Sequence, residues 1–132
     1  LSLHAPTDDI REMIMPINKK FKIKELIEHC KYYSSVVKEK ITLEYVMLRG
    51  INDSLECAQQ LIKLMAQFPC KVNLIEFNPW PGVQYLPTKR EEMEKFGKVI
   101  QEAGYIATIR RSRGQDILGA CGQLRTESLK IK

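Results

Sequence analysis

Cys121 is the residue of this chain best suited to covalent chemistry. It lies in the segment Gly119-Ala120-Cys121-Gly122-Gln123-Leu124, where small neighbours allow a large partner to approach the sulfur. Basic side chains nearby favour the thiolate, which is the nucleophilic form of the group. Four of them lie within a dozen residues: Arg110, Arg111, Arg113 and Arg125. The pattern therefore predicts a nucleophilic thiol, with a structural thiol as the alternative, and no adjacent His and acid pattern indicates a protease-type mechanism.

The other three cysteines have the sequence context of core residues. Cys30 and Cys57 lie within helical patterns, and Cys70 adjoins Pro69 at the start of an expected strand. The spacings between the four cysteines, 27, 13 and 51 residues, match neither a CxxC metal site nor a dense disulfide framework. We therefore expect no metal site among these cysteines and a reducing, cytoplasmic setting.

Two further segments carry polar groups that are able to bind a ligand. Ser2 and His4 are two residues apart on an expected strand, so they should project from the same face. Asn78 opens the rigid turn Asn78-Pro79-Trp80-Pro81-Gly82, in which two prolines restrict the backbone. Each has a plainer alternative, a satisfied structural histidine for His4 and an ordinary loop residue for Asn78.

Three polar residues interrupt strands that are otherwise apolar: Glu44, Asn73 and Glu76. Buried polar groups need partners, so side chains of this kind either bind one another or bind a ligand. The periodicity of the strands does not decide between these two possibilities.

The elements that must position these residues alternate along the chain. We expect strands over residues 1–3, 41–48, 71–77 and 105–111, and helices from Thr7 to before Pro16, over 23–34, from the capping box at 53–56 to about 67, and from the capping box at 88–91 to Gly104. This order predicts an α/β fold with a parallel sheet, either a small open sheet or part of a larger barrel. In both, ligands bind at the carboxyl ends of the strands, where His4, Met47–Asn52, Asn78–Gly82 and Arg111–Gly114 should gather.

The net charge of +5 is concentrated near the carboxyl end of the chain. Residues 1–104 hold 15 basic and 14 acidic side chains, whereas residues 105–132 hold 6 and 2. Such a surplus favours a nucleic-acid partner, with a solvated basic surface as the alternative. The sequence has no apolar run long enough for a membrane span and no signal-peptide pattern at residues 1–6.

Several motifs occur together in the order and spacing of one family. They are Ser2–Pro6, Met15–Asn18, Glu44–Leu48, Asn52-Asp53, Val72–Ile75, Phe77–Pro79 and Ala120–Leu124. Together they resemble the dual-specificity ribosomal RNA adenine-C2 methyltransferases, which are radical S-adenosylmethionine (SAM) enzymes. The resemblance covers nearly all 132 residues.

The resemblance implies a division of the chain and a role for each motif. Residues 1–111 would be the C-terminal half of a partial (β/α) radical SAM barrel, and residues 112–132 a tail that carries the methyl-accepting cysteine, Cys121. That cysteine would take a methyl group from SAM, forming S-methylcysteine, before transfer to C2 of an adenosine in 23S rRNA and in tRNA. Ser2, Leu3, His4 and Asn78 match SAM contacts. From their charge, we expect Arg110, Arg111 and Arg113 to place RNA phosphates.

The chain departs from the family pattern in several places. The CxxxCxxC loop that holds a [4Fe-4S] cluster is absent, as are the glycine-rich SAM segment and the second cysteine. Leu118 and Gly119 replace an expected acidic and small pair. The isolated chain should therefore be inactive, and its unpaired first strand should promote dimerisation or strand exchange.

Two alternative functions remain open. The sibling family that methylates C8 lacks the Arg113-Gly114 step and the Pro81-Gly82 pair of this chain, so C2 is favoured. A basic α/β module that binds RNA without chemistry is the second alternative.

Overall fold

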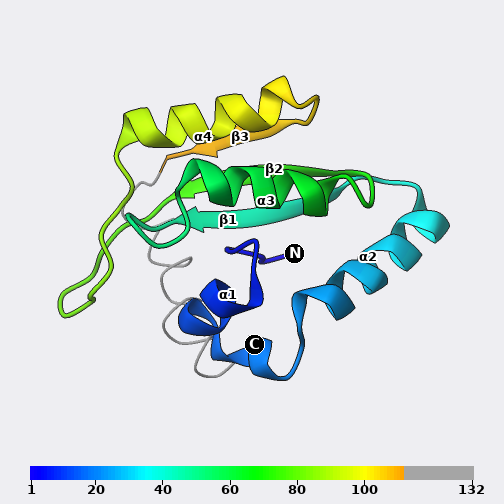
Figure 1. Cartoon of the computed structure of the whole chain (residues 1–132), viewed down its shortest axis with the longest axis horizontal. Coiled ribbons are helices and arrows are strands. Elements are labelled where there is room, and N and C mark those ends of the chain that lie inside the picture. Colours follow the sequence, from blue (N-terminus) through cyan, green and yellow to red (C-terminus); the bar gives the residue numbers. More distant parts are fainter. Residues whose placement is uncertain (112–132) are drawn as a thin grey trace.

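A computed structural model describes residues 1–111, which form a three-stranded sheet with helices packed against it (Figure 1). In chain order the elements are α1 (Asp8–Ile14), the 3₁₀ helix η1 (Pro16–Lys19), α2 (Ile23–Val37), β1 (Ile41–Met47), α3 (Leu55–Met65), β2 (Cys70–Glu76), α4 (Arg90–Glu102) and β3 (Ala107–Arg110). The expected α/β alternation is confirmed. Residues 112–132, including the expected tail with Cys121, lie outside the described part.

The sheet has the order β1-β2-β3, and both neighbouring pairs are parallel. Its carboxyl ends therefore meet at a single edge, toward which all three arrows point in Figure 1. Residues 1–4 lie beside β1, where Ser2 makes a parallel bridge with Glu44. A full strand at residues 1–3 was expected, but the ladder ends here because His4 has a φ of 59° and leaves the extended conformation.

The main hydrophobic core lies between one face of the sheet and helices α2, α3 and α4. It contains the alternate strand residues Leu43, Tyr45, Met47, Val72 and Leu74. Phe96 of α4 stacks on Tyr45 with ring centroids 5.4 Å apart. Val46 and Ile75 have the opposite alternation and join a smaller apolar cluster with Ile14 of α1. The sheet is thus covered on both faces near its carboxyl edge.

The helix starts follow local chemistry only in part. Thr7 caps α1 and Ser54 caps α3, each accepting a hydrogen bond from a backbone N–H three residues later. The expected capping box at 88–91 is wrong, because Lys89 is the N-cap of α4 without a side-chain bond and Thr88 instead donates to Asp53 at 2.7 Å. The Thr88 hydroxyl therefore binds a residue 35 positions away in the sequence and does not cap the helix that follows it.

The expected element boundaries need small corrections. Helix α2 continues past residue 34 to Val37 and ends where Lys38 adopts the left-handed conformation, with φ of 62°. Strand β3 is shorter than expected, since its first paired residue is Ala107, although the carbonyl oxygen of Ile106 accepts a hydrogen bond from the Val72 N–H of β2. Gly104 has a φ of 98° directly after the cap of α4, as its position predicts. No helix of the described residues is long and apolar enough to cross a membrane.

Candidate functional site

The carboxyl edge of the sheet brings together polar residues that are far apart in the sequence. His4 lies beside the end of β1, Asn78 follows β2 by two residues, and Arg110 ends β3. This is the edge at which ligands bind in open parallel sheets and barrels. The structure therefore places His4, Asn78 and Arg110 at the predicted edge, whereas Ser2 lies beside Glu44 in the middle of β1.

His4 is held as a neutral imidazole inside the protein. Its side chain is only 5% exposed, and its Nδ1 accepts a hydrogen bond of 2.9 Å from the backbone N–H of Val46. Burial, reinforced by the charges of Arg11 and the amino terminus, lowers the pKa of His4 to about 3. Because Nδ1 is an acceptor, the single ring proton lies on Nε2. The expectation that Ser2 and His4 project from the same strand face is wrong, because the backbone leaves the extended conformation at His4.

Asn52 links residues 1–4 to the end of β1. It is fully buried, and its Nδ2 donates to the carbonyl oxygens of His4 and Val46, both at 2.8 Å. Its Oδ1 accepts from the N–H of Leu48, and its own carbonyl oxygen accepts from the Tyr45 hydroxyl at 2.6 Å. The side-chain amide of Asn52 therefore forms all of these hydrogen bonds with backbone groups, those of His4, Val46 and Leu48.

Arg11 holds the same segment from the side of α1. Its side chain is 4% exposed, and its Nε and Nη2 donate to the carbonyl oxygens of Leu3 and Ser2, both at 3.0 Å. Its Nη1 donates to Oδ1 of Asn18 at 2.8 Å. Burial lowers the pKa of Arg11, an effect that the charge of Asp8 opposes. All three contacts are to neutral oxygens, so this charged group serves mainly to hold backbone and amide groups in place.

Two of the three polar residues inside the strands, Glu44 and Asn73, bind each other. Glu44, Asn73 and Thr108 are register partners on β1, β2 and β3. Asn73 donates to Glu44 Oε2 at 3.1 Å and accepts from the Thr108 hydroxyl. Since Ser2 bridges Glu44, a polar row crosses the sheet from residue 2 to residue 108. Of the two possibilities that the sequence left open, mutual pairing is the one observed for these side chains.

The loop that carries Asn78 is tied to the loop after β1. Arg49 donates through its N–H to Leu86 and through Nε to Pro87, at 2.8 and 3.0 Å. The ring of Trp80 packs edge-on against Phe77, with centroids 5.6 Å apart. Asn78 is half-buried between these contacts and the end of β2. The two loops thus form a joined rim at the carboxyl edge.

The expected arginine group is not a single cluster in the described residues. Arg110 is in register with Ile75, on the sheet face of the smaller apolar cluster. Arg111 lines a small cavity of about 90 Å³ on the other side, with Arg90, Met93 and Glu94 of α4. Arg113 and Cys121 lie outside the described residues, so their relation to this edge stays a prediction.

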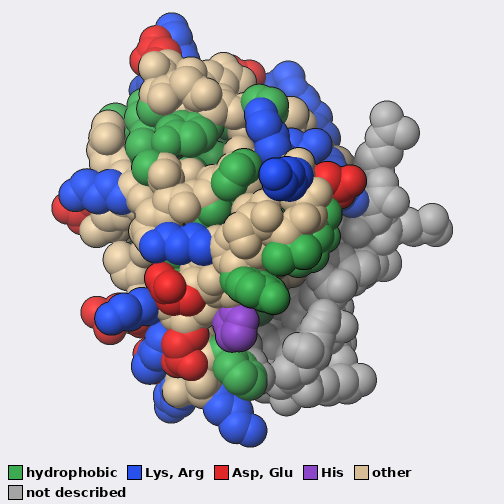
Figure 2. Space-filling model, turned by 90° about the vertical axis from the view of Figure 1, so that its right-hand side faces the viewer, with side chains coloured by type: hydrophobic (Ala, Val, Ile, Leu, Met, Phe, Trp, Pro, Cys, Tyr) green, Lys and Arg blue, Asp and Glu red, His purple; other side chains and the backbone are tan. Residues whose placement is uncertain are grey.

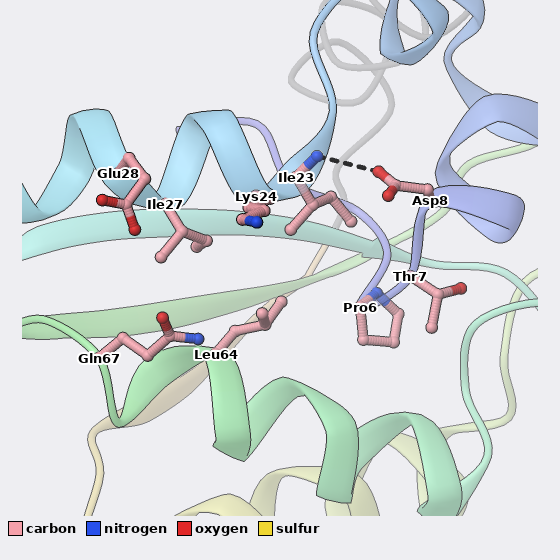
Figure 3. A pocket seen from close by; sticks show the side chains of 9 residues that line it. All are labelled: Pro6, Thr7, Asp8, Ile23, Lys24, Ile27, Glu28, Leu64 and Gln67. Carbon is pink, nitrogen blue, oxygen red and sulfur yellow. Dashed lines mark hydrogen bonds between the residues drawn. The ribbon is translucent and has the colours of Figure 1, made fainter.

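Two larger cavities lie away from the candidate site. One, of about 420 Å³, opens between α2 and α3 (Figure 3), where Ile23, Ile27 and Leu64 line it and Asp8 Oδ1 accepts from the N–H of Ile23. The other, of about 480 Å³, lies at the amino-terminal edge of the sheet beside Tyr33 and Ile41. Figure 2 views that edge and shows hydrophobic, basic and acidic side chains interspersed on it. Neither cavity includes a residue of the expected site.

The described residues offer no metal site. No group of three or more His, Cys, Asp or Glu residues among them is placed to hold an ion. Cys30, Cys57 and Cys70 are free and buried in the main core. Burial raises the pKa of Cys30, and it also raises that of Cys70 to about 11, so these thiols are poor ligands. The described residues therefore do not fit an iron–sulfur cluster.

Sequence reasoning missed Arg11 and gave Asn52 no role of its own. Asn52 was expected only as part of the Met47–Asn52 segment at the strand ends and of the Asn52-Asp53 motif, and Arg11 stood only inside a short helix. The available signals were a basic residue on a helix that packs against a strand and an Asn after a glycine turn, and both patterns are common. Their importance follows from contacts with residues 2–4, which are 8 or 9 positions from Arg11 and 48 positions from Asn52.

Comparison with known proteins shows which proteins share these features. A dual-specificity RNA methyltransferase RlmN from Granulibacter bethesdensis is 52% identical over 131 residues, 98% of this chain and 33% of that protein. The same-named protein from Rhizobium leguminosarum bv. trifolii is 53% identical over 133 residues, 100% of this chain and 33% of that protein. No family model matches the chain.

A solved structure supports the same grouping. The crystal structure of a radical SAM methyltransferase from Sphaerobacter thermophilus superposes with a TM-score of 0.86 and 42% identity, covering 96% of this chain and 37% of that one. The α/β fold expected from the motifs is therefore confirmed. The chain spans about a third of the length of the relatives it matches. Along almost its whole length it is similar to part of an RlmN-type radical SAM methyltransferase, which confirms the family resemblance that its motifs indicate.

Proposed function

We propose that this chain is the portion of a radical SAM RNA methyltransferase that holds part of the SAM site and carries the methyl-accepting cysteine. The product is an adenosine methylated at C2, in 23S rRNA and in tRNA, and the protein acts in the cytoplasm. The observation that carries the proposal is that His4 and Asn78, more than 70 positions apart in the sequence, both lie toward the carboxyl edge of one parallel sheet.

The SAM contacts in this proposal are Ser2, Leu3, His4 and Asn78. A neutral His4 with its proton on Nε2 would add no positive charge to a site for SAM, which is itself cationic at its sulfonium. The half-buried Asn78 amide offers a donor and an acceptor at the neighbouring strand end. Ser2, which is half-buried beside β1, completes the proposed contacts.

Cys121 is the acceptor in the first chemical step. Its thiolate sulfur attacks the methyl carbon of SAM, the bond from that carbon to the sulfonium breaks, and S-adenosylhomocysteine leaves with the electron pair. When bound, the [4Fe-4S] cluster supplies the radical chemistry that adenine C2 requires, and the chain contains no CxxxCxxC motif to ligate it. The isolated chain is therefore expected to be inactive.

RNA is bound in this proposal by basic side chains at the carboxyl end, Arg110, Arg111 and Arg113. Arg110 and Arg111 face opposite sides of the sheet edge, so they would contact different phosphates rather than one. Salt-dependent RNA affinity is the expected signature.

The test uses the longer protein that carries this chain, purified without oxygen and incubated with SAM and 23S rRNA. Mass spectrometry of the Cys121 peptide should show an added methyl group, and nucleoside analysis should show 2-methyladenosine. Cys121→Ala should lose both, whereas Cys30→Ala, which removes a buried core thiol, should retain both.

Three outcomes separate the alternatives. Absence of a methyl group on Cys121 under all SAM conditions contradicts the proposed role of this residue. Appearance of 8-methyladenosine assigns the sibling activity. Salt-sensitive RNA binding that survives Cys121→Ala, without any methylation by the parent, indicates a binding module.

A further inference from the structure

We propose that Arg11 and Asn52 are positioning residues that set the backbone of residues 2–4 for SAM binding. This inference rests on the proposed function, because it concerns the same ligand site. It adds two side chains that do not need to contact SAM and that act through carbonyl groups of the segment that does.

The strand ladder alone cannot hold residues 2–4. The segment forms an isolated bridge to β1, and the N–H groups of Leu3 and His4 both donate to the Glu44 carbonyl, at 3.0 and 3.2 Å. His4 then takes the left-handed conformation, which is unfavourable for a residue with a Cβ. A strained turn at the end of a one-bridge strand persists only where surrounding contacts over-determine it.

Asn52 supplies such contacts at the end of the segment. Its amide donates to the carbonyl oxygens of His4 and Val46 while accepting from the N–H of Leu48. The imidazole of His4 is held at the same place, because its Nδ1 accepts a hydrogen bond from the Val46 N–H. Both the main chain and the imidazole of His4 are therefore hydrogen-bonded close to the end of β1, the main chain through Asn52 and the imidazole through Val46.

Arg11 supplies the contacts at the start of the segment. The planar guanidinium reaches the carbonyls of Ser2 and Leu3 together, which fixes the orientation of two successive peptide groups. Asn18 orients Arg11 in turn, since it accepts from Nη1 and donates to Asp8 Oδ1 at 2.9 Å. Burying a guanidinium against neutral oxygens is costly, and an apolar residue would fill this volume more cheaply. The cost is explained if the orientation of residues 2–4 matters for binding.

The donors of the two side chains cover three consecutive carbonyl groups, those of Ser2, Leu3 and His4. These are the same three residues that match the SAM contacts of the family. A ligand that contacts these residues is sensitive to small displacements of their backbone. Loss of either clamp should therefore weaken SAM binding beyond what loss of stability alone explains.

The experiment measures SAM affinity, RNA affinity and the unfolding midpoint in the longer protein with its cluster in place. Asn52→Ala and Arg11→Met remove the donors. Asn52→Asp keeps an acceptor for the Leu48 N–H but loses both donors, and Arg11→Lys keeps the charge with a donor group that cannot span both carbonyls in the planar geometry. The matched control is Ile100→Ala, which opens a cavity in the main core at α4 and removes none of the hydrogen bonds to residues 2–4.

We expect the Kd for SAM to rise at least tenfold in Asn52→Ala, Asn52→Asp and Arg11→Met, and less in Arg11→Lys. RNA affinity should stay within twofold, and Ile100→Ala should lower the unfolding midpoint while binding SAM within twofold of the parent. Folded Asn52→Asp and Arg11→Lys proteins that bind SAM as the parent does overturn the inference. So does Ile100→Ala weakening SAM binding as much as the clamp variants at an equal midpoint. A parent that binds no SAM overturns the proposed function itself, and the inference with it.

Discussion

Lowering the pH should destabilise this fold through a single buried group, His4. The pKa of His4 is held at about 3 in the folded protein, below its ordinary 6.5, by burial and by the positive charge of Arg11. Between these values the unfolded chain binds a proton that the folded chain does not, so stability is lost as the pH falls through 6.5. At pH 5 the linkage relation gives a loss of about 2 kcal/mol relative to pH 7.5.

The structure offers a non-titrating replacement that keeps the local geometry. Asn at position 4 presents an acceptor oxygen where His4 Nδ1 accepts from the Val46 N–H, and Asn also tolerates a φ of 59°. The free energy of unfolding of His4→Asn should therefore differ much less between pH 7.5 and pH 5 than that of the parent. His29→Gln, which changes an exposed histidine of α2, is the matched control and should keep the difference seen in the parent.

Urea unfolding followed by circular dichroism at pH 7.5, 6 and 5 measures this effect. The reasoning assigns the loss to protonation of the imidazole that accepts from Val46. If His4→Asn loses as much stability as the parent between pH 7.5 and 5, other groups are responsible and the argument from burial is refuted.

Three further predictions concern the packing and the assembly of the chain. Phe96→Ala removes the ring that packs on Tyr45 and should lower the free energy of unfolding by about 3–5 kcal/mol, measured by urea titration; a loss below about 1 kcal/mol would contradict the described core. Ser54→Ala removes the acceptor for the Cys57 N–H at the start of α3 and should cost about 1 kcal/mol in the same assay, whereas a neutral change would argue against the cap. The 132-residue chain by itself should dimerise or exchange strands at the edge formed by residues 1–3, so a strictly monomeric mass in light scattering would disprove this expectation.

Local sequence patterns were sufficient for most of the elements. The apolar faces of α3 and α4 and the β-branched runs of β1 and β2 predicted their positions to within a few residues, because periodicity reports which face is buried. Local patterns failed where a distant partner decided the outcome. Thr88 has the chemistry of an N-cap, yet its hydroxyl binds Asp53, and the short 3₁₀ helix η1 was not expected.

The residues at the carboxyl edge show the same division. Sequence by itself determined the family resemblance, the α/β alternation and the identity of His4 and Asn78 as edge residues, since each follows from a local motif. Only the tertiary structure decided that Glu44 and Asn73 pair with each other, that His4 is neutral, and that Arg11 and Asn52 hold the backbone beside it. The physical reason is that hydrogen bonds and burial depend on distances between chain segments, which no local pattern of residue types specifies.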